Sequence, residues 1–215
     1  MKKYSVEQRG RSMIEMLGVL AIVGVLSVAG IAGYSKAMGK FKINKAMDQV
    51  STLAANIKTM YASVGTYDTL DDAQAFKLAL FPDEMVRGCD STSFTSAFLD
   101  FLISTAHADD TATTVTLTEL TPTIDCIRNG INGRASVDGN LADFQIAFDG
   151  VSKEACSAFV SSEWGGASGY KGLIVTGGTE DIEVTAAASV SDLFNAAANC
   201  NDCGNSNCTA TWTFY

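Results

Sequence analysis

Apolar residues form one unbroken run near the N-terminus, and this run dominates the hydrophobic pattern of the chain. From Met16 to Tyr34 no side chain is charged, and Ser27 is the only polar one before Tyr34. As an α-helix these 19 residues would cover roughly 28 Å at ~1.5 Å per residue, close to the thickness of a bilayer core. The pattern therefore predicts one transmembrane helix over residues 16–34.

Beyond Tyr34 the apolar residues continue at helical spacing, but on one face only. They recur every three or four residues, with lysines and other polar residues between them. The predicted buried stripe is Ile43, Ala46, Met47, Val50, Leu53, Ala54, Ile57, Met60 and Tyr61. No proline precedes Pro82, so we expect one helix from about Ser12 to Ser63. A coiled coil is the alternative, but the stripe is short and lacks regular flanking charge pairs.

The rest of the chain alternates between short helix and strand patterns. Helices are predicted from Thr69-x-x-Asp72 up to Pro82, over residues 93–106, after an N-cap at Ser152, and after an N-cap at Ser191. Strands are predicted over residues 114–118, 144–148, 173–176, 182–185 and 209–214, with turns at 129–130, 132–133, 149–150 and 177–178. Together these elements predict an α+β fold. Residues 65–215 form a globular domain, called the head below, whose antiparallel sheet packs on the long helix.

Charge is divided unevenly along the chain. Residues 1–65 carry a net charge of +6 and residues 66–215 carry −15. Basic residues before the apolar run, Lys2, Lys3, Arg9 and Arg11, favour a cytoplasmic N-terminus and an exported head. An acidic head repels phosphate, so nucleic acid is not an expected partner.

All six cysteines follow the apolar run. They are Cys89, Cys126, Cys156, Cys200, Cys203 and Cys208. An even number in an exported domain predicts three disulfides, which can be paired in 15 ways. The spacing of the last three also suggests zinc, but a second pair of ligands is missing and the only histidine, His107, is distant in sequence.

One acid, Glu15, heads the apolar run. A carboxylate there costs about 2.5 to 3.5 kcal/mol on insertion scales unless it is paired. Arg9-Gly10, four residues, Glu15 and then an apolar helix together resemble the processing and assembly signature of type IV pilins and pseudopilins. In that family a prepilin peptidase cleaves after the glycine and methylates the new N-terminus, and the glutamate pairs with the terminal amine of a neighbouring subunit.

The resemblance divides the N-terminal part of the chain. It implies a leader over residues 1–10, cleavage between Gly10 and Arg11, N-methylation of Arg11, and a mature helix over residues 11–64. Arg11 stands where the family usually has an aromatic or apolar residue.

Two alternative interpretations of the N-terminal segment are a signal peptide cleaved after Ala32 and a plain membrane anchor. The helical pattern continues beyond Ala32, which argues against the first, and the second leaves the cost of Glu15 unexplained.

Several head segments resemble type IVb pilins of the thin-pilus kind. They are Pro82-Asp-Glu-Met85, residues 144–148, Glu154-Ala-Cys156, Trp164-Gly165 and Trp212-x-Phe214. In that family a disulfide joins a helix of the sheet region to the C-terminal segment. The resemblance implies that Cys156 pairs with one of the last three cysteines, Cys200 being preferred. We then expect Cys203 to pair with Cys208, and Cys89 with Cys126.

No pattern in the sequence predicts catalysis, a cofactor or a metal site. His107 lies in a polar stretch without a recognisable catalytic partner. The glycines at 165, 166, 169 and 172 lack the Lys-Ser/Thr ending of a phosphate-binding loop, and we interpret them as turn residues. Asp202, Asn205 and Asn207 lack the spacing of a calcium loop and are better explained by a turn between cysteines.

The predicted function is therefore structural. We expect a type IV pilin that is held in the bacterial inner membrane, processed by prepilin peptidase, and extracted by the assembly machinery. It then forms a homo-oligomeric helical fibre outside the cell, a pilus of the kind used in adhesion. The alternatives are a minor pilin, a type II secretion pseudopilin, and, from another class, a membrane-anchored periplasmic binding domain or enzyme.

Overall fold

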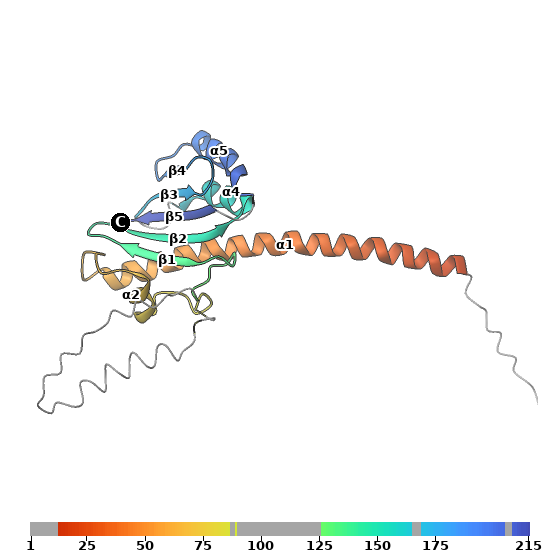
Figure 1. Cartoon of the computed structure of the whole chain (residues 1–215), viewed down its shortest axis with the longest axis horizontal. Helices are drawn as coiled ribbons and strands as arrows, with labels where there is room; N and C mark the ends of the chain where they lie inside the picture. The colour runs from red at the N-terminus through yellow and green to blue at the C-terminus, as the bar shows by residue number, and fades with distance from the viewer. Residues whose placement is uncertain (1–12, 87–88, 90–125, 165–168, 205–207) are drawn as a thin grey trace, which may run out of the picture. The chain divides into compact units, whose positions relative to one another are not determined.

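The computed structural model describes residues 13–86, 89, 126–164, 169–204 and 208–215. They belong to two compact units, residues 1–41 and 42–215, and helix α1 (Met13–Tyr61) begins in the first and ends in the second (Figure 1). The cleavage site Gly10-Arg11, the predicted helix 93–106 and the predicted strand 114–118 lie outside the described residues.

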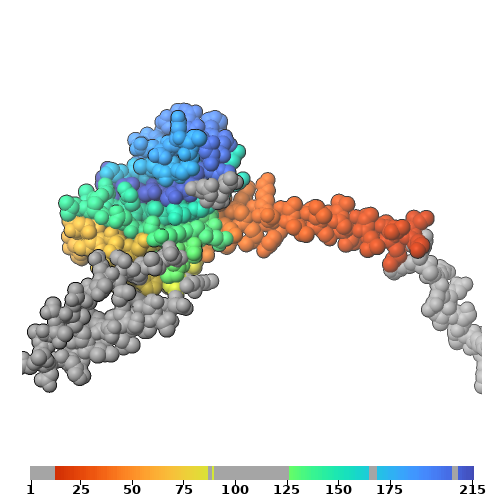
Figure 2. Space-filling view, viewed as in Figure 1, coloured from red at the N-terminus to blue at the C-terminus, as the bar shows by residue number. Residues whose placement is uncertain are grey.

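The described part of the first unit is α1 from Met13 to Phe41. Every described side chain from Met13 to Tyr34 is exposed, and Figure 2 draws this part of α1 in red to orange. By length and composition α1 can cross a membrane, with a mean hydropathy of 2.3 in its most apolar window. The Ser27 hydroxyl donates to the Val23 carbonyl at 2.8 Å, so the polar side chain in this run is satisfied within the helix.

The second unit is built on a five-stranded antiparallel sheet with the order β1-β2-β5-β3-β4. The strands are β1 (Ala135–Gly139), β2 (Phe144–Val151), β3 (Tyr170–Thr176), β4 (Ile182–Thr185) and β5 (Cys208–Phe214). The last strand in sequence is central: Trp212 of β5 lies opposite Ile146 of β2 and Leu173 of β3. The sheet is therefore completed only when the C-terminus is in place.

The core follows the predicted alternation. In β5 the residues Cys208, Ala210, Trp212 and Phe214 are buried. The Trp212 ring is fully buried and makes edge contacts with the rings of Phe148, Phe159 and Trp164 at centroid distances of 5.1 to 5.4 Å. Aromatic rings prefer such edge-to-face contacts to face-to-face stacking.

The amphipathic part of α1 contributes to the same core. Ala46, Val50, Leu53, Ala54, Ile57 and Tyr61 are buried, whereas Met60 is 46% exposed. Ile43 and Met47 are partly buried against the same core. The predicted stripe is thus confirmed except for Met60, because the helix ends one residue later and its last turn is partly open to solvent. A long helix packed on an antiparallel sheet is the predicted α+β fold.

Among the described residues, four short helices complete the second unit. They are α2 (Asp72–Lys77), α4 (Lys153–Ser161), α5 (Val190–Asn199) and the 3-10 helix η2 (Cys200–Cys203). Figure 1 shows α2 beside β1 at one edge of the sheet and α5 beside β4 at the other. Helix α4 has the predicted N-cap, with the Ser152 hydroxyl accepting from the Ala155 amide, and the predicted buried face.

Two other predicted caps are wrong. The cap of α5 is Ser189 and not Ser191, because Asp192 three residues later accepts from the Ser189 backbone amide and completes a capping box. The cap of α2 is Asp71 and not Thr69, since the Asp71 carboxylate accepts from the Gln74 amide at 2.6 Å. Helix α2 also ends at Lys77, well before Pro82.

Two predicted turns are strand residues instead. Strand β2 continues through Asp149-Gly150, where its register with β5 shifts in a bulge and Gly150 has φ +77°. A bulge needs an unusual backbone angle at one residue, which glycine adopts without steric cost. Gly172 lies inside β3, where an added Cβ would approach the Val184 oxygen at 3.1 Å.

The turn predicted at residues 129–133 is confirmed, and the Asn129 side chain anchors it. Its amide nitrogen donates to the carbonyls of Arg134 and Asp149 at 3.0 and 2.9 Å. Its amide oxygen accepts from the backbone amides of Ile131 and Gly133 at 3.1 and 2.9 Å. Asn129 is buried, and these bonds fasten the turn to β2.

We expect Gly133→Ala to lower the free energy of unfolding by about 2 to 3 kcal/mol, the range of an overpacked site. The added methyl group would overlap the backbone oxygen of Asp149, which cannot move without disturbing β2. Gly39→Ala is the matched control, since nothing lies within 4 Å of its Cβ. Thermal unfolding of the full chain in detergent measures both, and equal melting temperatures for the two variants would contradict the expectation.

Candidate functional site

Glu15 lies in the first turn of α1 with its side chain exposed. The free amide groups of a helix N-terminus favour a negative charge there. Within the part of the chain that the structure describes, Glu15 makes no ion pair. Its two sequence-predicted companions, Gly10 and Arg11, lie before the first described residue. The helix thus presents the carboxylate at its end, beside an apolar surface.

That apolar surface is too extensive for a free helix in water. Its exposed side chains include Leu17, Leu20, Ile22, Leu26 and Ile31, each between 63 and 71% accessible. The largest apolar patch on a typical soluble monomer is only ~300–600 Å² and is often itself functional. The surface of residues 13–34 therefore requires a cover of lipid or of other apolar chains.

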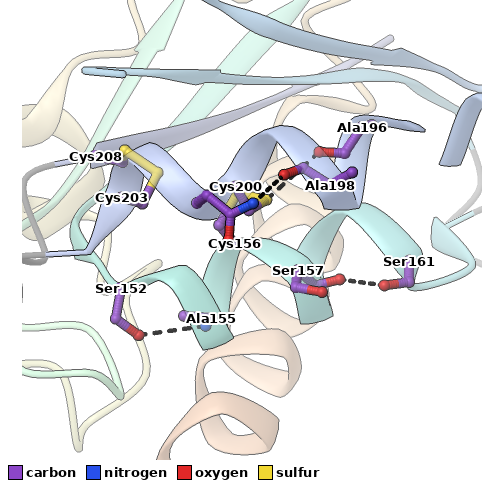
Figure 3. The surroundings of a disulfide bond; sticks show 11 residues. Ser152, Ala155, Cys156, Ser157, Ser161, Ala196, Ala198, Cys200, Cys203 and Cys208 are labelled. Atoms are coloured by element: carbon purple, nitrogen blue, oxygen red, sulfur yellow. Dashed lines mark hydrogen bonds between the residues drawn. A yellow bond between two sulfur atoms is a disulfide. The ribbon is translucent and has the colours of Figure 1, made fainter. Parts of the chain in front are cut away.

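The disulfides define the second candidate region. Cys156 of α4 is bonded to Cys200 at the start of η2, and Cys203 of η2 is bonded to Cys208 at the start of β5 (Figure 3). The third bond joins Cys89 to Cys126. These are the pairings that the resemblance and the remaining cysteines led us to expect. Since all six sulfurs are bonded, no thiolate is left to bind zinc.

Asp202 serves as a structural link between the disulfide region and the sheet. Its carboxylate accepts from the backbone amide of Thr179 at 3.4 Å and from the Thr179 hydroxyl, which holds the loop between β3 and β4 against η2. Among the described residues no three His, Cys, Asp or Glu side chains are arranged to hold a metal ion. Asn205, Asn207 and His107 lie outside those residues.

An ion pair not predicted from the sequence closes the other end of the sheet. Lys171 of β3 donates to Asp143 at 2.7 Å, and Asn140 donates to the same carboxyl group. The hydrogen bond from Lys171 holds the pKa of Asp143 below its ordinary value, and the same bond raises the pKa of Lys171. The two residues are 28 positions apart, so only the register of the sheet brings them together.

The amphipathic half of α1 makes a second polar contact with the head. The Gln49 amide donates to Glu84 at 2.8 Å, and Lys45 lies 3.7 Å from the same carboxylate. Farther along, Lys58 lies 5.9 Å from the centre of the Phe214 ring, and burial lowers the pKa of Lys58. These contacts hold α1 against the chain after α2 and against β5.

Comparison with known proteins adds evidence that is independent of the N-terminal signature. The Bundlin family model matches residues 36–215, which is most of the chain and begins after the apolar run. The chain belongs to the Bundlin family. Bundlins are type IV pilins of the bundle-forming pilus, so the predicted pilin family is confirmed. No curated protein matches the sequence.

Membership of the Bundlin family relates the two candidate regions, the apolar surface of α1 and the disulfide-bonded head, to one kind of protein. A pilin subunit assembles into a pilus fibre, and an apolar helix surface without a cover is what such an assembly needs. Most of the family match belongs to the disulfide-bonded head. The signature around Glu15 lies outside the matched range, so the two indications do not depend on each other.

Proposed function

We propose that this chain is the major structural subunit of a type IVb pilus, processed by prepilin peptidase and polymerised through its apolar helix. The observation that carries the proposal is the uncharged, exposed surface of α1 over residues 16–34, headed by Glu15 and followed by a Bundlin-family head. Before assembly the helix lies in the inner membrane with its N-terminus in the cytoplasm. After assembly the head lies outside the cell.

The apolar helix performs two tasks with the same side chains. In the bilayer its leucines, isoleucines and valines contact lipid tails, and in the fibre they contact the equivalent helices of other subunits. Lipid tails are as apolar as leucine, so the exchange is driven by packing and by polar contacts rather than by the hydrophobic effect alone. Such a helix can leave the membrane for the fibre at moderate cost.

Glu15 sets the position of each subunit relative to its neighbour. After cleavage at Gly10 the amine of Arg11 begins the mature chain, four residues before Glu15. A carboxylate in an apolar core is strongly unfavourable unless it is paired. Pairing Glu15 with the N-terminal amine of an adjacent subunit satisfies both charges at one axial offset.

Mass spectrometry of the mature N-terminus tests the processing step. We expect a chain that begins at an N-methylated Arg11, and we expect Gly10→Val to accumulate a precursor ten residues longer because the peptidase recognises the glycine. Gly18→Ala is the matched control and should be processed normally, since nothing lies within 4 Å of a Cβ added at Gly18. A mature chain that begins at Met1 or Gly33 would contradict the proposal.

A minor pilin or a type II pseudopilin is the second candidate, because the N-terminal signature is common to all three. Three disulfides and a head of about 150 residues favour the main subunit of an external fibre. Quantitative mass spectrometry of sheared fibres distinguishes them. This chain should be the most abundant component of the fibre if it is the major pilin, and a trace component otherwise.

A further inference from the structure

A cluster of lysines follows the apolar run of α1. Lys36, Lys40, Lys42 and Lys45 fall within ten residues, and no acid occurs between Glu15 and Asp48. The proposed export of the head places this cluster on the outer side of the inner membrane. Basic residues close to a membrane helix normally favour the cytoplasmic side, so lysines on the opposite side need a local partner.

Two of the four lysines, Lys42 and Lys45, belong to the second unit. Lys45 lies 3.7 Å from Glu84, and Lys42 is half-buried. Lys36 and Lys40 belong to the first unit and are exposed. In the described part of the chain neither of them makes an ion pair or a side-chain hydrogen bond.

Helix geometry fixes how far these two ammonium groups lie from the apolar run. Lys36 and Lys40 follow Tyr34 by two and six residues in a continuous helix, which is about 3 and 9 Å at ~1.5 Å per residue. The headgroup layer on each side of a bilayer core is roughly 5 to 8 Å thick. With residues 16–34 in the core, Lys36 therefore lies within the headgroup layer and Lys40 at its outer edge. Side chains of a helix tilt toward its N-terminus, so both ammonium groups reach the lipid phosphates.

The spacing of the two lysines and the neighbouring aromatic residues also agree with a position in the headgroup layer. Lys36 and Lys40 are four residues apart and share one face of the helix. Tyr34 and Phe41, 69 and 61% exposed, lie on the opposite face. Aromatic side chains of this kind are enriched at the membrane interface, so the aromatic face and the lysine face occupy the same layer.

We propose that Lys36 and Lys40 bind the phosphate groups of anionic phospholipids in the outer leaflet of the inner membrane and so hold the unassembled subunit. This inference rests on the membrane-stored precursor of the proposed function. Charge complementarity selects the occupant: among the described residues neither ammonium group has an acidic partner, and both reach the lipid phosphates. Extraction into the fibre then exchanges lipid phosphates for other partners.

The test uses the full chain in vesicles that contain phosphatidylglycerol and phosphatidylcholine in a ratio of one to three. Spin-labelled versions of the two lipids report their relative association with the protein. Each lysine near an anionic surface favours association by about fivefold, so we expect phosphatidylglycerol to be enriched around the wild type by at least about fivefold. The enrichment should disappear in Lys36→Gln/Lys40→Gln and decrease in high salt.

The control variant is Lys77→Gln/Lys153→Gln, which changes the net charge equally at two exposed lysines of the head and should keep the enrichment. A wild type that floats with the vesicles but shows no lipid preference overturns the lipid site alone. A wild type that does not float overturns the membrane-stored precursor, and the lipid site with it. If the double variant keeps the enrichment but loses fibres, the lysines contact other subunits and the inference is overturned.

Discussion

Glu15→Ala abolishes pilus fibres while export of the head and removal of the leader remain intact; this is the largest effect that we expect of one substitution. A charge costs up to about 2.5 to 3.5 kcal/mol in a membrane helix. Alanine removes this cost and has the highest helix propensity, so the precursor inserts at least as well. The substitution prevents assembly, because the N-terminal amine of the next subunit then has no carboxylate to pair with.

The magnitude follows from the cost of an unpaired buried charge. Breaking such a pair costs about 3 to 5 kcal/mol, and every 1.4 kcal/mol is tenfold in an equilibrium constant. Each subunit contact is therefore weakened by roughly two to four orders of magnitude. Electron microscopy of cells and immunoblots of sheared fibres measure the outcome, and mass spectrometry of the membrane fraction checks that cleavage after Gly10 still occurs.

Two further variants separate charge from shape. Glu15→Gln keeps the size of the side chain and loses its charge, and it should also prevent assembly. Ser27→Ala changes another polar residue of the same run, whose hydroxyl is already bonded to the Val23 carbonyl, and should leave fibres unchanged. Abundant normal pili from Glu15→Ala would remove the proposed role of this residue.

Loss of the disulfide between Cys156 and Cys200 is expected to be the most destabilising change in the head. The two residues are 44 positions apart, and closing a loop of this length contributes about 4 kcal/mol in the chain-entropy model. Cys156→Ala/Cys200→Ala should therefore lower the free energy of unfolding by at least this amount, and the melting temperature by about 10 °C. Thermal unfolding of the full chain in detergent gives the value.

The bond between Cys203 and Cys208 provides an internal comparison. It closes a loop of only five positions, for which the same model gives about 2 kcal/mol. All four cysteines are buried, so alanine leaves a similar small void at each, and the difference between the double variants reports loop closure. Equal losses, or a larger loss for Cys203→Ala/Cys208→Ala, would contradict loop closure as the source of the stabilisation.

The candidate assembly segment was predictable from the sequence because its signals are local. An uncharged run of 19 residues specifies a helix that needs an apolar cover, whatever the rest of the chain does. Glu15 is recognisable because a charge in a membrane helix has a known free-energy cost. The cleavage site at Gly10 and the pairing of Glu15 are still predictions, since they depend on residues before Met13 and on a second subunit.

Other elements were missed because their residues carry weak local signals. Strand β1 (Ala135–Gly139) contains serine, aspartate and glycine and becomes a strand through its pairing with β2 and through the bond from the Val137 amide to Asp72 at 2.6 Å. The bulge at Gly150 and the ion pair between Asp143 and Lys171 likewise depend on register. Ser189 and Ser191 compete for one cap, and the reciprocal bonds of Asp192 decide between them.

By itself the sequence determined the apolar helix, its amphipathic continuation, the alternating strands β2 and β5, and the number of cysteines. These follow from periodicity, which is a property of neighbouring residues. Only the tertiary structure decided the order β1-β2-β5-β3-β4, the edge strand β1, and the pairing of Cys156 with Cys200 out of fifteen arrangements. These features depend on which distant segments can pack together. Each local pattern is compatible with several folds, and the free energy of the one buried core that helix and sheet share selects among them.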